Sequence, residues 1–158
     1  MEIKQYNNDL YSNLVGSVKL IFKNVNTGME EVYHILNVVV HAGKTSIARR
    51  LGNAEAGYGK ITYCATGTGV GSPVASDVAM FTELFRKAIS VVTLNSNVVT
   101  FTTYFATSES NGTLKEVGLF GDGATAVAGS GTMYAHTNIT RTKTSSDTLT
   151  IEWSLTVN

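Results

Sequence analysis

The chain has 158 residues, and 12 lysine and arginine residues balance 12 aspartate and glutamate residues, so its formal net charge is zero. This length fits one domain that buries a sizeable core. Only 15% of the residues are charged, and a neutral chain lacks the basic excess with which proteins attract nucleic acid. We therefore expect a single domain over residues 1–158 that does not bind nucleic acid.

The N-terminal segment, residues 1–14, precedes the first clear strand pattern. It has no basic leader followed by an apolar run, so we expect synthesis in the cytoplasm without Sec export and no membrane partner. The segment mixes apolar side chains with amides and is a candidate docking arm, with a frayed terminus as the alternative. Its candidate contact residues are Tyr6, Leu10, Tyr11 and Leu14.

Period-two alternation in runs rich in Val, Ile, Thr, Tyr and Phe dominates the chain and is typical of β-strands. Turn residues separate the runs, which predicts an all-β domain, an antiparallel β-sandwich of jelly-roll type. Trp153 and the single cysteine, Cys64, fall on apolar faces and are expected in the core. The predicted strands are 18–22, 31–40, 61–66, 88–93, 98–105, 113–120, 131–137 and 150–157.

The stretch HAGKTS, residues 41–46, contains the Gly-Lys-Thr end of a phosphate-binding P-loop. A P-loop also needs a glycine five positions before its Gly-Lys pair, where backbone N–H groups wrap the phosphates. Val38 stands there. We instead predict a short helix behind the preceding strand, with Thr45 or Ser46 as its N-cap.

A second short helix is predicted over residues 76–88. Val78, Phe81, Leu84 and Phe85 recur there at helical spacing behind a serine and an aspartate that could cap the helix. The preceding glycines at 67, 69 and 71 do not form a dinucleotide-binding motif, because Ser72 follows them. They predict a loop that reverses the chain, and residues 120–132 predict an exposed, mobile hairpin loop.

No residue pattern supplies catalytic chemistry. His34, His41 and His136 have no metal-ligand spacing, and Ser130 lacks the strand-turn-helix context of a nucleophile elbow. We expect no metal, no cofactor and no enzymatic activity. The alternative, a glycan-degrading enzyme, would need a pair of carboxylates in a groove. The candidates for such a pair are Glu109, Glu116, Asp122 and Asp147.

Glu116 stands between apolar residues, and strict alternation places it on the same face as Leu114 and Phe120. A carboxylate on an apolar face is costly to bury unless it is paired. Two interpretations are open. Either Glu116 faces water on an edge strand, or Arg86 at the end of the second helix pairs with it and locks helix to sheet.

Six segments in order carry a resemblance: NVVVHAGKTSIARRL, ITYCATGTG, DVAMFTELFRK, KEVGLFG, GTMYAHTNI and TLTIEWSLTV. This order resembles tailed-bacteriophage virion proteins of the tail-fibre, head-fibre and minor structural type. The resemblance covers about three quarters of the chain and leaves out the first thirty or so residues. By position, its structural motif residues are Gly67, Thr68, Gly69, Asp77, Glu83, Arg86, Glu116, Gly118, Leu119, Phe120 and Trp153.

The resemblance implies a structural component of the virion without catalytic activity. It would act through protein–protein contacts as a tail or baseplate adaptor, a fibre base or a capsid-decorating fibre. Its partners would be other virion proteins and copies of itself, and family analogy suggests a trimer. The alternative is a carbohydrate-binding receptor module, in which Tyr58, Tyr63, Tyr104 or Tyr134 would stack on a host-surface glycan.

Overall fold

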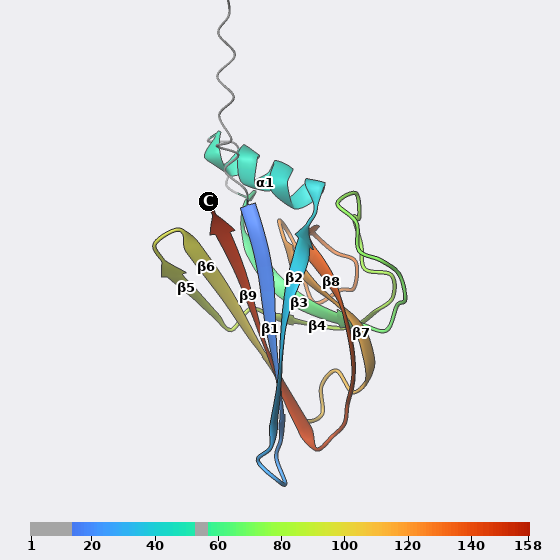
Figure 1. Ribbon diagram of the computed structural model, residues 1–158. Coiled ribbons are helices and arrows are strands. Elements are labelled where there is room, and N and C mark those ends of the chain that lie inside the picture. The colour runs from blue at the N-terminus through green and yellow to red at the C-terminus, as the bar shows by residue number, and fades with distance from the viewer. Residues whose placement is uncertain (1–13, 53–56) are drawn as a thin grey trace, which may run out of the picture.

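The computed structural model describes residues 14–52 and 57–158, which form nine strands and one helix. The prediction of an all-β, sandwich-like fold is confirmed (Figure 1). In chain order the elements are β1 (Leu14–Asn24), β2 (Glu30–Val39), α1 (His41–Leu51), β3 (Ile61–Gly67), β4 (Glu83–Ala88), β5 (Val91–Asn95), β6 (Val98–Phe105), β7 (Gly112–Gly121), β8 (Thr132–Lys143) and β9 (Asp147–Val157).

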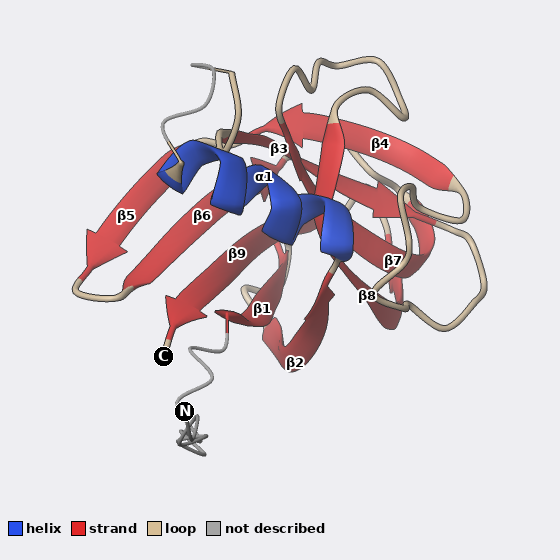
Figure 2. Ribbon diagram, turned by 90° about the horizontal axis from the view of Figure 1, so that it is seen from above, coloured by secondary structure: helices blue, strands red, loops and turns tan. Residues whose placement is uncertain are grey.

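All nine strands belong to one antiparallel sheet, in the order β4-β3-β7-β8-β2-β1-β9-β6-β5. β2 joins its two parts, because most of β2 pairs with β1 whereas only Val38 and Val39 pair with β8. The sheet folds over there, so that β1, β9, β6 and β5 form a first half-sheet and β8, β7, β3 and β4 a second. Figure 2 shows the curled arrangement from above.

The main core lies between the two half-sheets. Val18, Phe101 and Ile151 of the first half-sheet join one buried cluster with Val117 and Leu119 of the second. Trp153 and Cys64 are both fully buried, as predicted, and the Trp153 indole Nε1 donates to the Cys64 sulfur across the core at 3.3 Å. Burial raises the pKa of the Cys64 thiol to about 12.

Helix α1 crosses one open end of the sandwich and packs on β8 (Figure 1). It begins at His41 with Val40 as N-cap and no side-chain cap, so the prediction of a cap at Thr45 or Ser46 is wrong. The close approach depends on Gly43, because a Cβ there would lie 2.6 Å from the Tyr134 Cα. Contact with the sheet therefore starts this helix earlier than its capping pattern indicated.

The predicted second helix is wrong. Residues 68–82 form an irregular loop, and the segment that follows is β4, which pairs with β3. The apolar period did not mark a buried helix face, since Val78 is 74% exposed and Phe81 41% exposed. Pairing along β3 and the hydrogen bonds of the loop to the sheet outweigh local helix preference.

The strand predicted at 88–93 is two strands, because the chain turns at Ile89 and Ser90 from the edge of one half-sheet to the edge of the other. The remaining predicted strands are present. Most are longer than predicted, whereas β2 ends and β8 begins one residue inside the predicted range. The segment predicted as an exposed hairpin loop does connect β7 and β8.

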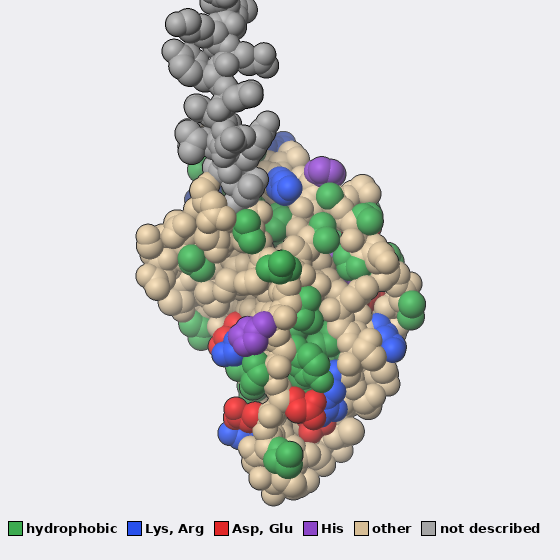
Figure 3. Space-filling view, viewed as in Figure 1, with side chains coloured by type: hydrophobic (Ala, Val, Ile, Leu, Met, Phe, Trp, Pro, Cys, Tyr) green, Lys and Arg blue, Asp and Glu red, His purple; other side chains and the backbone are tan. Residues whose placement is uncertain are grey.

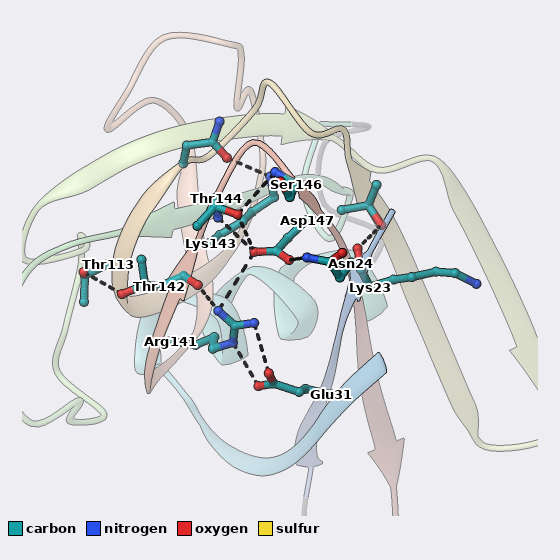
Figure 4. A network of polar contacts seen from close by, with 12 residues as sticks. Lys23, Asn24, Glu31, Thr113, Arg141, Thr142, Lys143, Thr144, Ser146 and Asp147 are labelled. Carbon is teal, nitrogen blue, oxygen red and sulfur yellow. Dashed lines mark hydrogen bonds and ion pairs between the residues drawn. The ribbon is translucent and has the colours of Figure 1, made fainter. Parts of the chain in front are cut away.

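A polar network closes the end of the sandwich opposite α1 (Figure 1), where the turns of β1–β2 and β8–β9 meet. Figure 4 shows this network from close by. Asp147 accepts hydrogen bonds from Thr144 and from the Asn24 amide, and Arg141 makes a two-pronged ion pair with Glu31. Although burial alone would raise it, the pKa of Asp147 is lowered by the combined hydrogen bonds. The Lys143 ammonium, also buried, donates to Ala106 O and Asn111 Oδ1.

Candidate functional site

Most motif residues of the resemblance, Leu119 and Trp153 excepted, come together on the outer face of the second half-sheet, the face turned away from the main core. The loop of residues 68–82 lies over this face. A second apolar cluster fills the space beneath the loop, with Met80 from the loop itself and Phe120 and Met133 from the sheet. Charged groups are buried beside this cluster, and they make it the candidate site.

Glu116 lies at the centre of the site and has no exposed surface. A bulge between Leu114 and Glu116 turns the carboxylate to the outer face while Leu114 stays in the main core. The prediction that Glu116 shares a face with Leu114 is therefore wrong, whereas the shared face with Phe120 is confirmed. The interpretation of a water-facing edge charge is also wrong.

Backbone groups of the overlying loop satisfy the Glu116 carboxylate. Oε1 accepts from the N–H groups of Gly69 at 3.0 Å and Thr82 at 2.7 Å, and Oε2 accepts from that of Phe81 at 2.9 Å. A carboxylate that receives several N–H bonds is well compensated for its burial. Glu116 thus fastens both ends of the loop to the sheet.

The glycines of the loop explain how the backbone comes so close to this carboxylate. A Cβ at Gly69 would lie 2.5 Å from Glu116 Oε1, and one at Gly67 would lie 2.6 Å from the same atom. A side chain at either position would push the loop off the sheet. The Gly-Thr-Gly motif therefore allows close approach of the chain to Glu116.

His136 and Asp77 complete the cluster. The buried His136 ring faces Glu116 Oε2 at 2.8 Å through Nε2 and Asp77 Oδ2 at 3.1 Å through Nδ1. The Phe81 ring covers it, with ring centroids 5.0 Å apart. Asp77 also accepts the Val74 N–H at 2.8 Å within the loop. The order carboxylate–imidazole–carboxylate resembles a proton relay, but a fully buried imidazole offers no atom to a substrate.

A second charged cluster lies on the same face. Arg86 is buried and makes two hydrogen bonds to Glu83, at 2.6 and 2.7 Å, so the proposed pair of Arg86 with Glu116 is wrong. Its guanidinium stacks over Phe120 at 4.3 Å and donates to Ser130 O at 2.8 Å. Arg86 therefore holds the β7–β8 connection against β4, and Ser130 is part of that contact.

A third polar cluster joins α1 to the sheet, and the sequence analysis missed it. The Tyr134 hydroxyl lies 2.7 Å from both Ser46 Oγ and Asp122 Oδ1, and Ser46 also donates to Asp122. Burial raises the pKa of the Tyr134 phenol. The sequence signal here is the turn pattern Gly-Asp-Gly at 121–123, in which Asp122 adopts a φ of 48°, the left-handed conformation that Asp tolerates better than most residues.

The other motif residues have structural positions. Thr68 pairs through its backbone N–H with Thr82 O, and Leu119 and Trp153 lie in the main core. At Gly118 an added Cβ would lie 2.9 Å from the Met80 sulfur. Of the predicted docking arm, Tyr6, Leu10 and Tyr11 lie outside the described residues, and Leu14 is the first residue of β1.

The carboxylates proposed for a glycosidase are engaged separately. Glu109 pairs with Lys87, and this hydrogen bond lowers the pKa of Glu109. Glu116, Asp122 and Asp147 belong to the three different networks described above. Within residues 14–52 and 57–158, no group of three or more His, Cys, Asp or Glu side chains is arranged to hold a metal ion. In the same ranges no helix has the length and apolar character needed to cross a bilayer.

The outer face of the first half-sheet is open and carries a shallow groove of about 340 Å³. Residues of β1, β2 and β9 line it, with the polar Lys19, His34 and Glu152 beside apolar side chains of β1 and β2. Figure 3 shows a histidine with charged neighbours on this face. Tyr104 lies on the same face and is 47% exposed. Tyr134 is fully buried, so it cannot stack on a sugar.

Tyr58 and Tyr63 are less accessible than Tyr104. The guanidinium of Arg49 lies 3.9 Å from the centre of the Tyr58 ring, and Tyr63 packs against the second apolar cluster.

Comparison of the chain with protein-family models, with curated proteins and with solved structures gives no match. The resemblance to phage virion proteins therefore rests on the sequence motifs.

Proposed function

We propose that this protein is a structural subunit of a tailed-phage virion that acts through protein–protein contacts and not through catalysis. One observation supports this most: the motif residues hold loops on the sheet. On the sheet, Glu116 binds backbone N–H groups of the 68–82 loop, and His136 binds Asp77 of that loop. Arg86 and Glu83 bind the β7–β8 connection in the same way. A scaffold that presents firmly attached loops suits binding by shape.

Within this proposal the subunit serves as a tail or baseplate adaptor, a fibre base or a capsid-decorating unit. Low charge supports it, since a neutral surface gives little repulsion between packed copies. Copies of itself and other virion proteins are its partners, and its location is the virion. The trimer stays a prediction from family analogy.

The test is direct detection in particles. Phage particles from the source of this sequence are purified by density gradient, analysed by mass spectrometry and labelled with gold-conjugated antibody against the protein. The proposal expects the chain at a fixed ratio to the major capsid protein and label at one location. A chain that is abundant in the lysate and absent from washed particles contradicts it.

The second candidate is a carbohydrate-binding receptor module, and the open face of the first half-sheet favours it. Tyr104 offers an exposed ring on that face, and the groove on the same face presents Ser17, Lys19 and Glu152 for hydrogen bonds to hydroxyl groups. A glycan array probed with the protein tests it. Binding that is lost in Tyr104→Ala and kept in Tyr63→Ala supports this candidate, and no binding removes it.

A further inference from the structure

The edge strand β5 exposes apolar side chains that alternation would place in the core. Val92 pairs with Phe101 and Leu94 pairs with Val99, so both apolar side chains point to the core side of the first half-sheet. Nevertheless Val92 is 54% exposed and Leu94 78% exposed. The second half-sheet does not reach over β5, whose core-side face is therefore uncovered (Figure 2).

An apolar cavity continues this uncovered face into the molecule. It measures about 390 Å³ and lies at the α1 end of the main core. Leu94 lines it together with Val99, Leu155 and Val157, while Ile47 of α1 and Ile61 of β3 close the other side. An open apolar cavity beside exposed apolar side chains marks an interaction site.

Among residues 14–52 and 57–158, β5 ends the sheet and pairs with β6 alone, which leaves the other side of its backbone without a strand partner there. Protected edge strands usually carry a charge, a proline or a bulge. β5, with the sequence VVTLN, has none of these. The opposite edge, β4, carries Glu83, Arg86 and Lys87, and a bulge interrupts its pairing with β3. Of the two sheet edges, β5 is the one open to another strand.

We propose that β5 pairs antiparallel with β5 of a second copy of this chain, with Thr93 opposite Thr93 on a two-fold axis. In this register Val92 of each copy faces Leu94 of the other, on the same core-side face of the joined sheet. The absence of charge on β5 removes like-charge repulsion between the identical strands. The two apolar cavities then lie beside the shared strand pair.

This inference deepens the part of the proposed function in which copies of the chain assemble. A two-fold contact uses the same surface on both subunits and closes with two copies. It therefore gives a dimer, and the trimer that family analogy suggests would need a different contact. A five-residue strand pair is a small interface, so we expect weak association that needs high protein concentration.

Light scattering and sedimentation equilibrium on the full chain, up to about 1 mM, test the dimer, since even weak contacts associate at that concentration. A mass of twice 16.9 kDa is expected. Leu94→Lys should weaken dimerisation at least tenfold without unfolding the protein. Leu36→Lys is the matched control, because Leu36 is 77% exposed on β2, and it should dimerise normally. A monomer or a trimer across this range overturns the proposal.

Disulfide trapping tests the register separately. The chain has one cysteine, the buried Cys64, so an introduced cysteine is the reactive one. Thr93→Cys should cross-link to itself within a dimer. Val91→Cys should not, because in this register the two position-91 residues of the dimer lie about 13 Å apart along the strand pair. Equal cross-linking of the two variants overturns the register. Particle detection stays independent: a monomer found in virions contradicts only β5 pairing, and a dimer absent from virions contradicts only the virion role.

Discussion

The two half-sheets differ in whether the charged side chains on their outer faces are buried or exposed. On the second, Glu116 and His136 are fully buried beneath the 68–82 loop. On the first, Glu152 pairs with Lys19 at 3.2 Å, and both side chains keep about a third of their surface exposed. Both carboxylates belong to strands, Glu116 to β7 next to a bulge and Glu152 to β9. The covering loop buries one carboxylate among hydrogen-bond donors and leaves the other exposed to water, so we expect the two to differ in their contribution to stability.

The largest expected effect comes from Glu116→Gln, because the amide group would face backbone N–H donors with a donor of its own. Breaking a buried charged network costs about 3–5 kcal/mol, whereas an exposed pair such as that of Glu152 contributes about 0–1 kcal/mol. Urea unfolding of Glu116→Gln and Glu152→Gln measures the difference. Similar losses in the two variants would refute the contrast between the faces.

The next effect tests the close approach of the loop. In Gly69→Ala the new Cβ would lie 2.4 Å from the Phe81 Cβ, so the loop must shift. We expect a loss of about 1–3 kcal/mol, typical of overpacking. Gly57→Ala is the control, because a Cβ there meets no atom within 4 Å. Thermal unfolding of both variants checks the prediction, and an unchanged midpoint for Gly69→Ala would contradict it.

A double-mutant cycle separates the two charged clusters of the covered face. Arg86 and Glu83 are directly bonded, so Arg86→Met and Glu83→Gln should show a coupling of about 1–3 kcal/mol in the free energy of unfolding. Arg86→Met and Glu116→Gln should be additive within about 0.5 kcal/mol, because no contact joins these side chains. The reverse pattern would restore the pairing that the sequence suggested.

Acid should weaken the end of the molecule shown in Figure 4. The folded-state pKa of Asp147 lies below its ordinary value of 3.8, and that of Glu109 below 4.5. The unfolded chain then binds more protons, so this stability is complete above those ordinary values and is lost as pH falls through the folded pKa. Urea unfolding between about pH 6 and pH 2.5 measures the slope, which Asp147→Asn should flatten. An equally steep slope in the variant would contradict this.

The smallest expected signal concerns the core that both half-sheets share. Burial raises the pKa of Cys64 to about 12, and the thiol has no exposed surface. A thiol reagent at pH 8 should therefore not react with the native protein over hours, and should react fully in urea. Rapid native reaction would mean that the sandwich opens between its half-sheets.

The sequence by itself determined much of the fold. Period-two alternation is a local property, and it located the strands from Val98–Phe105 to the C-terminal strand and placed Trp153 in the core. The motif order also selected residues that meet in space, since Gly69, Asp77 and Glu116 prove to be neighbours. The sequence around Gly69 is enough to predict a loop there, but it does not reveal that Glu116, 47 positions away, accepts its N–H.

Tertiary structure decided what depends on distant partners. Residues 76–88 have helical spacing, yet hydrogen bonds to Glu116 and pairing with β3 give them a loop and a strand. A bulge beside Glu116 reversed the face of Leu114, because one extra residue shifts a period-two pattern. The exposed β5 follows from how far the opposite half-sheet extends. Alternation identified which side chains share a face, and only the folded sheet decided which faces were covered.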